Sequence, residues 1–79
     1  MSIRFFTKGN NTKLFMLAID DEKGGLHECF LSNGTWEETS DLMGMLIKGS
    51  TEIDEIDEKT ASELYKDKGF EEAMTKFNN

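Results

Sequence analysis

The stretch "KLFMLAID", Lys13 to Asp20, carries the strongest structural signal in the sequence. Every residue from Leu14 to Ile19 is apolar, and in a strand these residues would alternate between the two faces of a sheet. A strand that is apolar on both faces is typical of the centre of a sheet that is covered on both sides. A chain of 79 residues has few helices for that task, so we expect one face of this strand to be left over as an interface.

Segments with strand character flank this stretch on both sides. Ile3 to Lys8 is rich in phenylalanine and aliphatic residues, and the polar "KGNNTK" that follows it is typical of a tight reversal. After the glycine-rich "DDEKGG", Leu26 to Ser32 is the next candidate strand, and Asn33-Gly34 suits a two-residue turn. Thr35 to Glu37 is a candidate for a short fourth strand.

The pattern becomes helical after Glu38. Ser40 is a candidate N-cap with Asp41 in the first turn, and mostly apolar residues follow until Gly49. Gly44 weakens this prediction, because glycine costs about 1 kcal/mol relative to alanine inside a helix. A short helix is still the best interpretation of the segment.

The segment "STEIDEIDEK", Ser50 to Lys59, is unusually acidic, with five acids in seven consecutive residues. Its isoleucines, Ile53 and Ile56, are three residues apart, which fits neither an alternating strand nor a helix with a full apolar face. We therefore predict an extended connection here. Asp57 is the candidate N-cap of the helix that follows, so part of the acidity has a structural explanation.

Two apolar stripes with helical spacing occupy the rest of the chain. The first comprises Ala61, Leu64 and Tyr65, and the second comprises Phe70, Ala73, Met74 and Phe77. The stripes are out of phase, which predicts a break in the helix near Gly69.

The length and the order of these elements predict one α+β domain over residues 1–79. We expect a small antiparallel sheet of three to four strands from the N-terminal half. Two or three helices from the C-terminal half are expected to pack on it, mainly on one side.

Charge is distributed unevenly along the chain. Residues 1–19 contain three basic residues and no acid, whereas residues 20–79 contain all sixteen acids and six lysines, a net charge of −10. Direct binding to nucleic acid or to an anionic membrane is disfavoured, because such partners require a basic surface that displaces their counterions. A basic protein partner is favoured instead.

Signals for catalysis, metals and cofactors are weak. Cys29 is the only cysteine, which excludes an internal disulfide and favours a reducing, cytoplasmic setting. The longest apolar run is six residues, far below the ~20 of a membrane span, and no signal peptide is recognisable. His27 and Cys29 are expected to be an exposed imidazole and a packed thiol, because too few further ligands or bases accompany them. We predict no catalytic residue, no metal site and no cofactor.

The acids between residues 37 and 58 form the main candidate site. With Lys48 they give a local charge of −7, and such a negative surface can accelerate association with a basic partner. Trp36 stands at a turn just before two of these acids and is expected to be an exposed anchor. The predicted partner-binding residues are Trp36, Glu37, Glu38, Asp41, Glu52, Asp54, Glu55, Asp57 and Glu58.

The leading hypothesis is a small non-catalytic protein that docks on a basic protein as a regulator or inhibitor. A nucleic-acid-handling machine is one such partner, and a phage-encoded inhibitor is one analogy. The first alternative is a structural module that forms a homodimer through the spare sheet face, with the acids serving only solubility. The second alternative is a binder of divalent cations.

Overall fold

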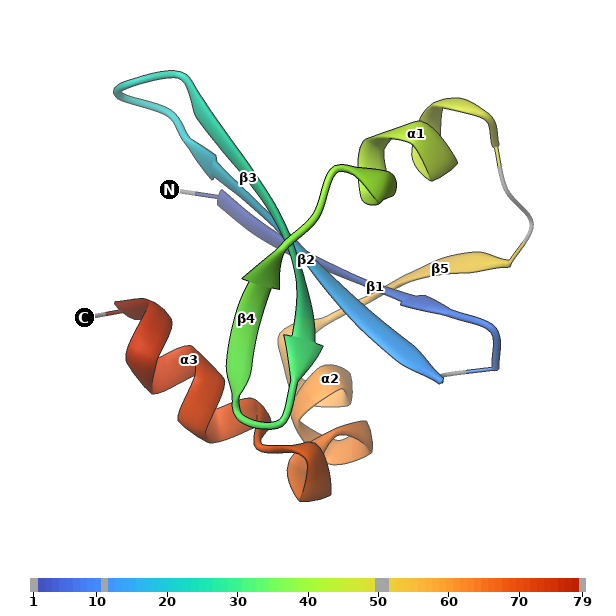
Figure 1. Ribbon diagram of the computed structural model, residues 1–79, viewed down its shortest axis with the longest axis vertical. Helices are drawn as coiled ribbons and strands as arrows, with labels where there is room; N and C mark the ends of the chain where they lie inside the picture. Colours follow the sequence, from blue (N-terminus) through green and yellow to red (C-terminus); the bar gives the residue numbers. More distant parts are fainter. Residues whose placement is uncertain (1, 11, 50–51, 79) are drawn as a thin grey trace.

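The computed structural model describes residues 2–10, 12–49 and 52–78 of the chain (Figure 1). The strands are β1 (Ser2–Lys8), β2 (Lys13–Asp20), β3 (Gly25–Ser32), β4 (Thr35–Glu38) and β5 (Ile53–Ile56). The helices are α1 (Asp41–Ile47), α2 (Glu58–Leu64), the 3-10 helix η1 (Lys66–Lys68) and α3 (Phe70–Asn78). The predicted α+β class is confirmed, but the sheet has five strands rather than three or four.

The five strands form one antiparallel sheet in the order β4-β3-β2-β1-β5, with β2 at its centre as predicted. The pairing places Phe6 opposite Phe15 and Phe15 opposite Phe30, so three phenylalanines form a row across one face. Asn33 and Gly34 both have positive φ in the turn between β3 and β4, as a two-residue hairpin requires.

The strand β5 corrects the prediction of an extended connection after residue 52. It pairs with β1, with Ile56 opposite Phe5 and Ile53 opposite Lys8. Because residues three apart in a strand point to opposite faces, each isoleucine joins a different apolar cluster. The three-residue spacing of the isoleucines therefore belongs to a strand that places one partly buried residue on each face of the sheet.

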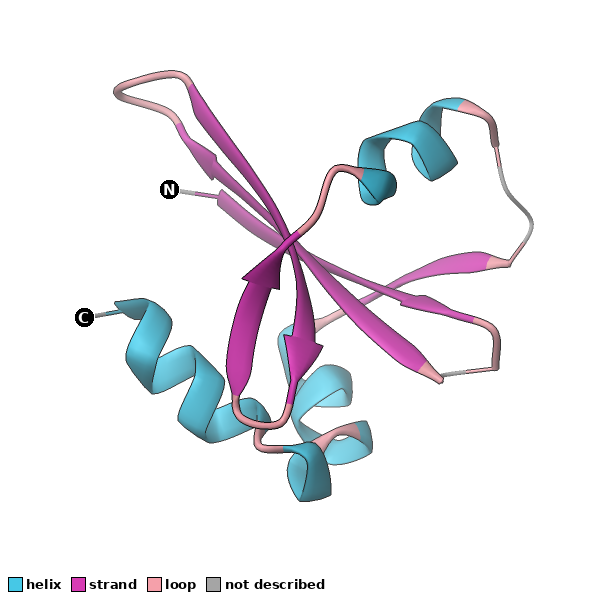
Figure 2. Cartoon of the chain, viewed as in Figure 1, coloured by secondary structure: helices cyan, strands magenta, loops and turns pink. Residues whose placement is uncertain are grey.

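Helices cover both faces of the sheet, which also differs from the prediction. α2, η1 and α3 lie on one face, and α1 lies across the sheet from them (Figure 2). α1 occurs between β4 and β5, so the helices are not all C-terminal to the sheet. Leu42 of α1 is fully buried over Phe15 and Leu17, whose exposures are 1% and 3%. The leftover apolar face expected for β2 is therefore already covered within one chain.

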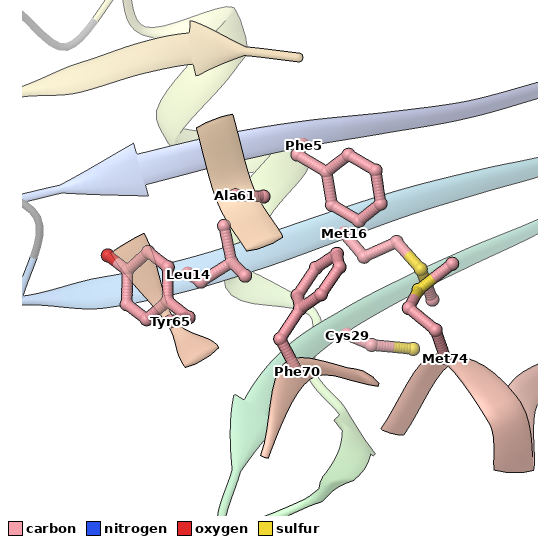
Figure 3. Packing of buried hydrophobic residues seen from close by; sticks show 8 residues of the cluster. All are labelled: Phe5, Leu14, Met16, Cys29, Ala61, Tyr65, Phe70 and Met74. Atoms are coloured by element: carbon pink, nitrogen blue, oxygen red, sulfur yellow. The ribbon is translucent and has the colours of Figure 1, made fainter. Parts of the chain in front are cut away.

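The larger apolar cluster lies between the sheet and the C-terminal helices (Figure 3). The Phe70 ring is 5.5 Å from that of Phe5 and 6.1 Å from that of Trp36, centroid to centroid. The cluster includes members of both predicted helical stripes, from α2 and from α3. Its buried residues are Phe5, Leu14, Met16, Cys29, Ala61, Tyr65, Phe70 and Met74.

The two predicted N-caps behave differently. Asp57 caps α2 as predicted, since its Oδ1 accepts a hydrogen bond from the Thr60 amide at 2.8 Å. Ser40 occupies the N-cap position of α1 but its side chain makes no capping hydrogen bond. Glu28 of β3 takes that role, with its Oε1 accepting from the Met43 amide at 2.7 Å.

The predicted break between α2 and α3 is confirmed at Gly69, which has φ +80°. The backbone there touches the turn between β3 and β4, where the Gly34 amide donates to the Lys68 carbonyl at 3.1 Å. A Cβ on Gly69 would lie 2.6 Å from the Gly34 Cα. Two glycines therefore allow the hairpin and the helical segment to meet backbone to backbone.

Candidate protein-binding surface

The predicted acidic belt divides into two groups in the folded chain. Glu37, Glu38 and Asp41 lie on β4 and at the start of α1, and we call them the β4 acids. The second group, on or beside β5 and at the start of α2, is called the β5 acids and comprises Glu52, Asp54, Glu55, Asp57 and Glu58. β4 and β5 are opposite edges of the sheet. At about 4.8 Å per strand these edges are roughly 19 Å apart, so salt screens Glu37 and Glu38 from the β5 acids at physiological ionic strength.

Among the β5 acids, Glu55 is held by an ion pair and Asp57 caps a helix. Glu55 forms a two-point ion pair with Arg4, with Nε 2.9 Å from Oε2 and NH2 2.6 Å from Oε1. Hydrogen bonding to Arg4 lowers the pKa of Glu55, and the same contact raises the pKa of Arg4. Both side chains are half exposed, and exposed pairs of this kind contribute about 0.2–1 kcal/mol.

Asp57 is the second acid with a structural role. Hydrogen bonds from the side chain and backbone of Thr60 lower its pKa below the usual value for an aspartate. Asp54 and Glu58 flank these two residues and are also exposed, but neither of them holds Arg4 or caps α2. Asp54 and Glu58 are therefore the carboxylates of this edge that are best placed to meet another molecule.

Acid is expected to destabilise the fold through Glu55 and Asp57. Both have a pKa that is lower in the folded chain than the unfolded values of about 4.3 and 3.9. A group with a lowered pKa stabilises the fold above its unfolded pKa, and this contribution disappears as the pH falls through the folded pKa. We expect the urea midpoint, followed by Trp36 fluorescence, to fall between pH 5 and pH 3. The urea midpoint of the double variant Glu55→Gln, Asp57→Asn should fall less steeply over this range. An identical decline would mean that Glu55 and Asp57 do not cause the loss of stability in acid.

The β4 acids are more loosely held. The Glu38 Oε1 lies 3.9 Å from the Nδ1 of His27, which makes an ion pair only when the imidazole is protonated, and both side chains are exposed. Glu37 and Asp41 are also exposed. This group is smaller and less dense than the group along β5.

Trp36 is half-buried rather than exposed. Its ring packs on the larger apolar cluster, 6.2 Å from Phe5 and edge-on to Phe70. Its Nε1 is buried and has no hydrogen-bond partner among the residues that the structure describes. Trp36 belongs to β4, so it lies at the opposite edge of the sheet from the β5 acids and does not share a contact surface with them.

Other sites for chemistry are sparse. In the described part of the chain, no three His, Cys, Asp or Glu side chains are grouped to hold a metal ion. His27 is exposed and Cys29 is buried, as predicted. Burial raises the pKa of the Cys29 thiol, and the negative charges of Glu38 and Glu28 raise it further. Among the described residues, no helix has the length and apolar character needed to cross a bilayer.

A cleft that was not predicted from the sequence lies between α1 and the end of the β1–β2 hairpin. Its volume is about 360 Å³, and its lining residues are Lys8, Lys13, Phe15, Ser40, Asp41, Gly44, Met45 and Lys48. Two of the lysines come from the acid-free first part of the chain, which was the only available signal. The third, Lys48, is brought there by α1, whose place in the fold the sequence did not show.

Known proteins give no indication of the function of this chain. No family model, curated protein or solved structure matches the chain. Inference of function therefore depends on the contacts, charges and exposure of the described residues.

Proposed function

We propose that this protein is a small non-catalytic module that binds a basic segment of another protein along β5. The observation that carries the proposal is the position of β5 at the edge of the sheet, with acidic residues along and beside it. A regulator or inhibitor of a nucleic-acid-handling protein fits this role, because such proteins carry the basic segments that contact phosphates.

An edge strand offers two kinds of interaction to an extended peptide. Every second residue directs its backbone N–H and C=O groups away from the sheet, where an added strand can pair with them. Asp54 and Glu55 point to opposite faces of β5, and Glu55 is already paired with Arg4, so Asp54 is the carboxylate of β5 that an added strand would meet. An added strand with its lysines on the face of Asp54 would therefore be recognised, and the negative field would accelerate its approach.

Self-association along β5 is disfavoured by the same charges. Two copies of this strand would bring like charges close together across the pair, which is destabilising. The argument for a homodimer through a spare face of β2 no longer holds either, because α1 covers that face. The acids of β5 therefore suit a basic partner better than a second copy of the chain.

Titration with a peptide of alternating lysine and valine tests the proposal directly. We expect amide chemical shifts to change along β5 and the neighbouring β1, with affinity falling as salt is raised. The double variant Asp54→Asn, Glu58→Gln should bind about 5–30-fold more weakly, because each exposed charge pair contributes up to about 1 kcal/mol. These two residues are chosen because neither holds Arg4 nor caps α2.

The matched control is the double variant Glu37→Gln, Glu38→Gln, which removes the same charge from the opposite edge. It should keep the affinity of the original protein to within about twofold, because the two edges are separated by more than a Debye length. Equal weakening by both double variants would show that only net charge attracts the peptide. Chemical shifts confined to β4 would place the binding surface at the wrong edge.

A further inference from the structure

We propose that the cleft between α1 and the β1–β2 hairpin binds a small molecule that carries a phosphate group. We call it the lysine cleft, after Lys8 of β1, Lys13 of β2 and Lys48 at the C-cap of α1. Lys8 is paired with Ile53 of β5, but none of the β5 acids lines the cleft, and the proposal does not depend on the function proposed for that edge.

The charge of the lysine cleft is opposite to that of the protein. Three ammonium groups and one carboxylate, that of Asp41, line it, while the whole chain carries a net charge of −7. Within residues 2–10, 12–49 and 52–78, none of the three lysines forms an ion pair with a carboxylate. A doubly charged anion would balance the local excess of positive charge.

The positive charges of two of the lysines repel each other. Lys8 and Lys13 are directly opposite each other in the β1–β2 pair, so their side chains leave the sheet on the same face. Like charges in this position destabilise a sheet. An anion between the ammonium groups would convert that repulsion into attraction.

The ammonium group of Lys13 is also held in place before any ligand arrives. Its Nζ lies 4.4 Å from the centre of the Phe30 ring and 5.2 Å from that of Phe15. Cation–π contacts of this kind restrict the side chain without neutralising it. Lys13 therefore presents its charge at the cleft with less loss of side-chain freedom on binding.

α1 and its N-cap leave both room and a hydroxyl donor at the cleft. Gly44 lies inside α1, where glycine is unfavourable, yet a Cβ built on it meets nothing within 4 Å. No described neighbour therefore requires glycine there, whereas a side chain would take up space at the cleft. Ser40 lines the same cleft, and its hydroxyl is not used to cap α1 because Glu28 does so.

The size and chemistry of the cleft favour a small phosphate monoester over a nucleic acid. A volume of about 360 Å³ is within the range of small-molecule sites. Ammonium groups and a hydroxyl are typical donors to phosphate oxygens. A nucleic acid would instead place its extended backbone against the acidic remainder of the surface.

Titration with inorganic phosphate at constant ionic strength tests the site, with amide chemical shifts as the readout. We expect saturable changes at residues of the lysine cleft, and about tenfold weaker binding in Lys48→Gln. The matched control Lys59→Gln removes an exposed lysine from α2 and should leave the affinity unchanged.

A variant at Gly44 separates loss of binding from loss of folding. Gly44→Gln replaces glycine by a good helix former and should raise Tm by about 3–5 °C while it fills the cleft. We expect this more stable variant to lose saturable phosphate binding. Unchanged affinity in Gly44→Gln, equal weakening in the Lys59→Gln control, or no saturation with the original protein would overturn the proposal.

Discussion

The Gly69→Ala variant is expected to have a free energy of unfolding about 2–5 kcal/mol lower than that of the original protein. Gly69 has φ +80°, and a left-handed backbone costs a non-glycine residue about 1–2 kcal/mol. The new Cβ would also lie 2.6 Å from the Cα of Gly34, which belongs to backbone that cannot move aside as a side chain does. Urea unfolding followed by Trp36 fluorescence measures the sum of both effects.

The matched control is Gly24→Ala. Gly24 has a similar φ of +70°, but a Cβ built on it meets nothing within 4 Å. Gly24→Ala should therefore show the backbone cost alone, about 1–2 kcal/mol. Equal losses in the two variants would mean that the contact between Gly34 and Gly69 does not constrain the fold.

The Phe70→Ala variant is expected to lose about 3–5 kcal/mol of stability, which is the usual effect of removing a buried aromatic ring. Phe70 is 1% exposed and contacts the rings of both Phe5 and Trp36. Its removal would leave a cavity between α3 and the sheet. A single core in a domain of this size rarely supplies more than about 3–5 kcal/mol of stability, so the variant should be partly unfolded at 25 °C. The far-ultraviolet circular dichroism and the urea midpoint measure the effect.

Leu64→Ala is the control for this experiment. Leu64 belongs to the preceding helix α2 and is 47% exposed, so its truncation should cost less than about 1 kcal/mol. A comparable loss in both variants would show that the cluster around Phe70 is not the main source of stability.

The sheet and its centre were predictable because local patterns determine them. The apolar run from Leu14 to Ile19 specifies a central strand, and the Asn33-Gly34 turn fixes the hairpin beside it. The break at Gly69 was predictable from the phase of two apolar stripes. Each of these inferences uses residues that are close together in the sequence.

The features that were missed depend on residues far apart in the chain. β5 pairs with β1, and Arg4 reaches Glu55 from 51 residues away. No local period reveals such a partner, and a strand with one isoleucine on each face resembles neither standard pattern. The same long-range pairing places β5 and β4 at opposite edges, so acids that are near in sequence become separated in space.

The neighbours of Trp36 in the sequence also did not determine whether its side chain is exposed or packed. A turn on one side and two glutamates on the other suggested exposure. The ring instead packs against α3, which begins more than thirty residues later. Only the arrangement of β4 beside α3 decides how much of the indole faces solvent.

The pairing of β1 with β5 has a consequence for how the chain folds during its synthesis. β1 and β2 can form a hairpin early, but the outer edge of β1 stays unprotected until Ile53 to Ile56 have emerged from the ribosome. Contacts between distant segments slow folding and leave apolar strands open to aggregation meanwhile. We therefore expect nascent chains that stop before residue 53 to be held by chaperones, and release to follow the arrival of the last strand.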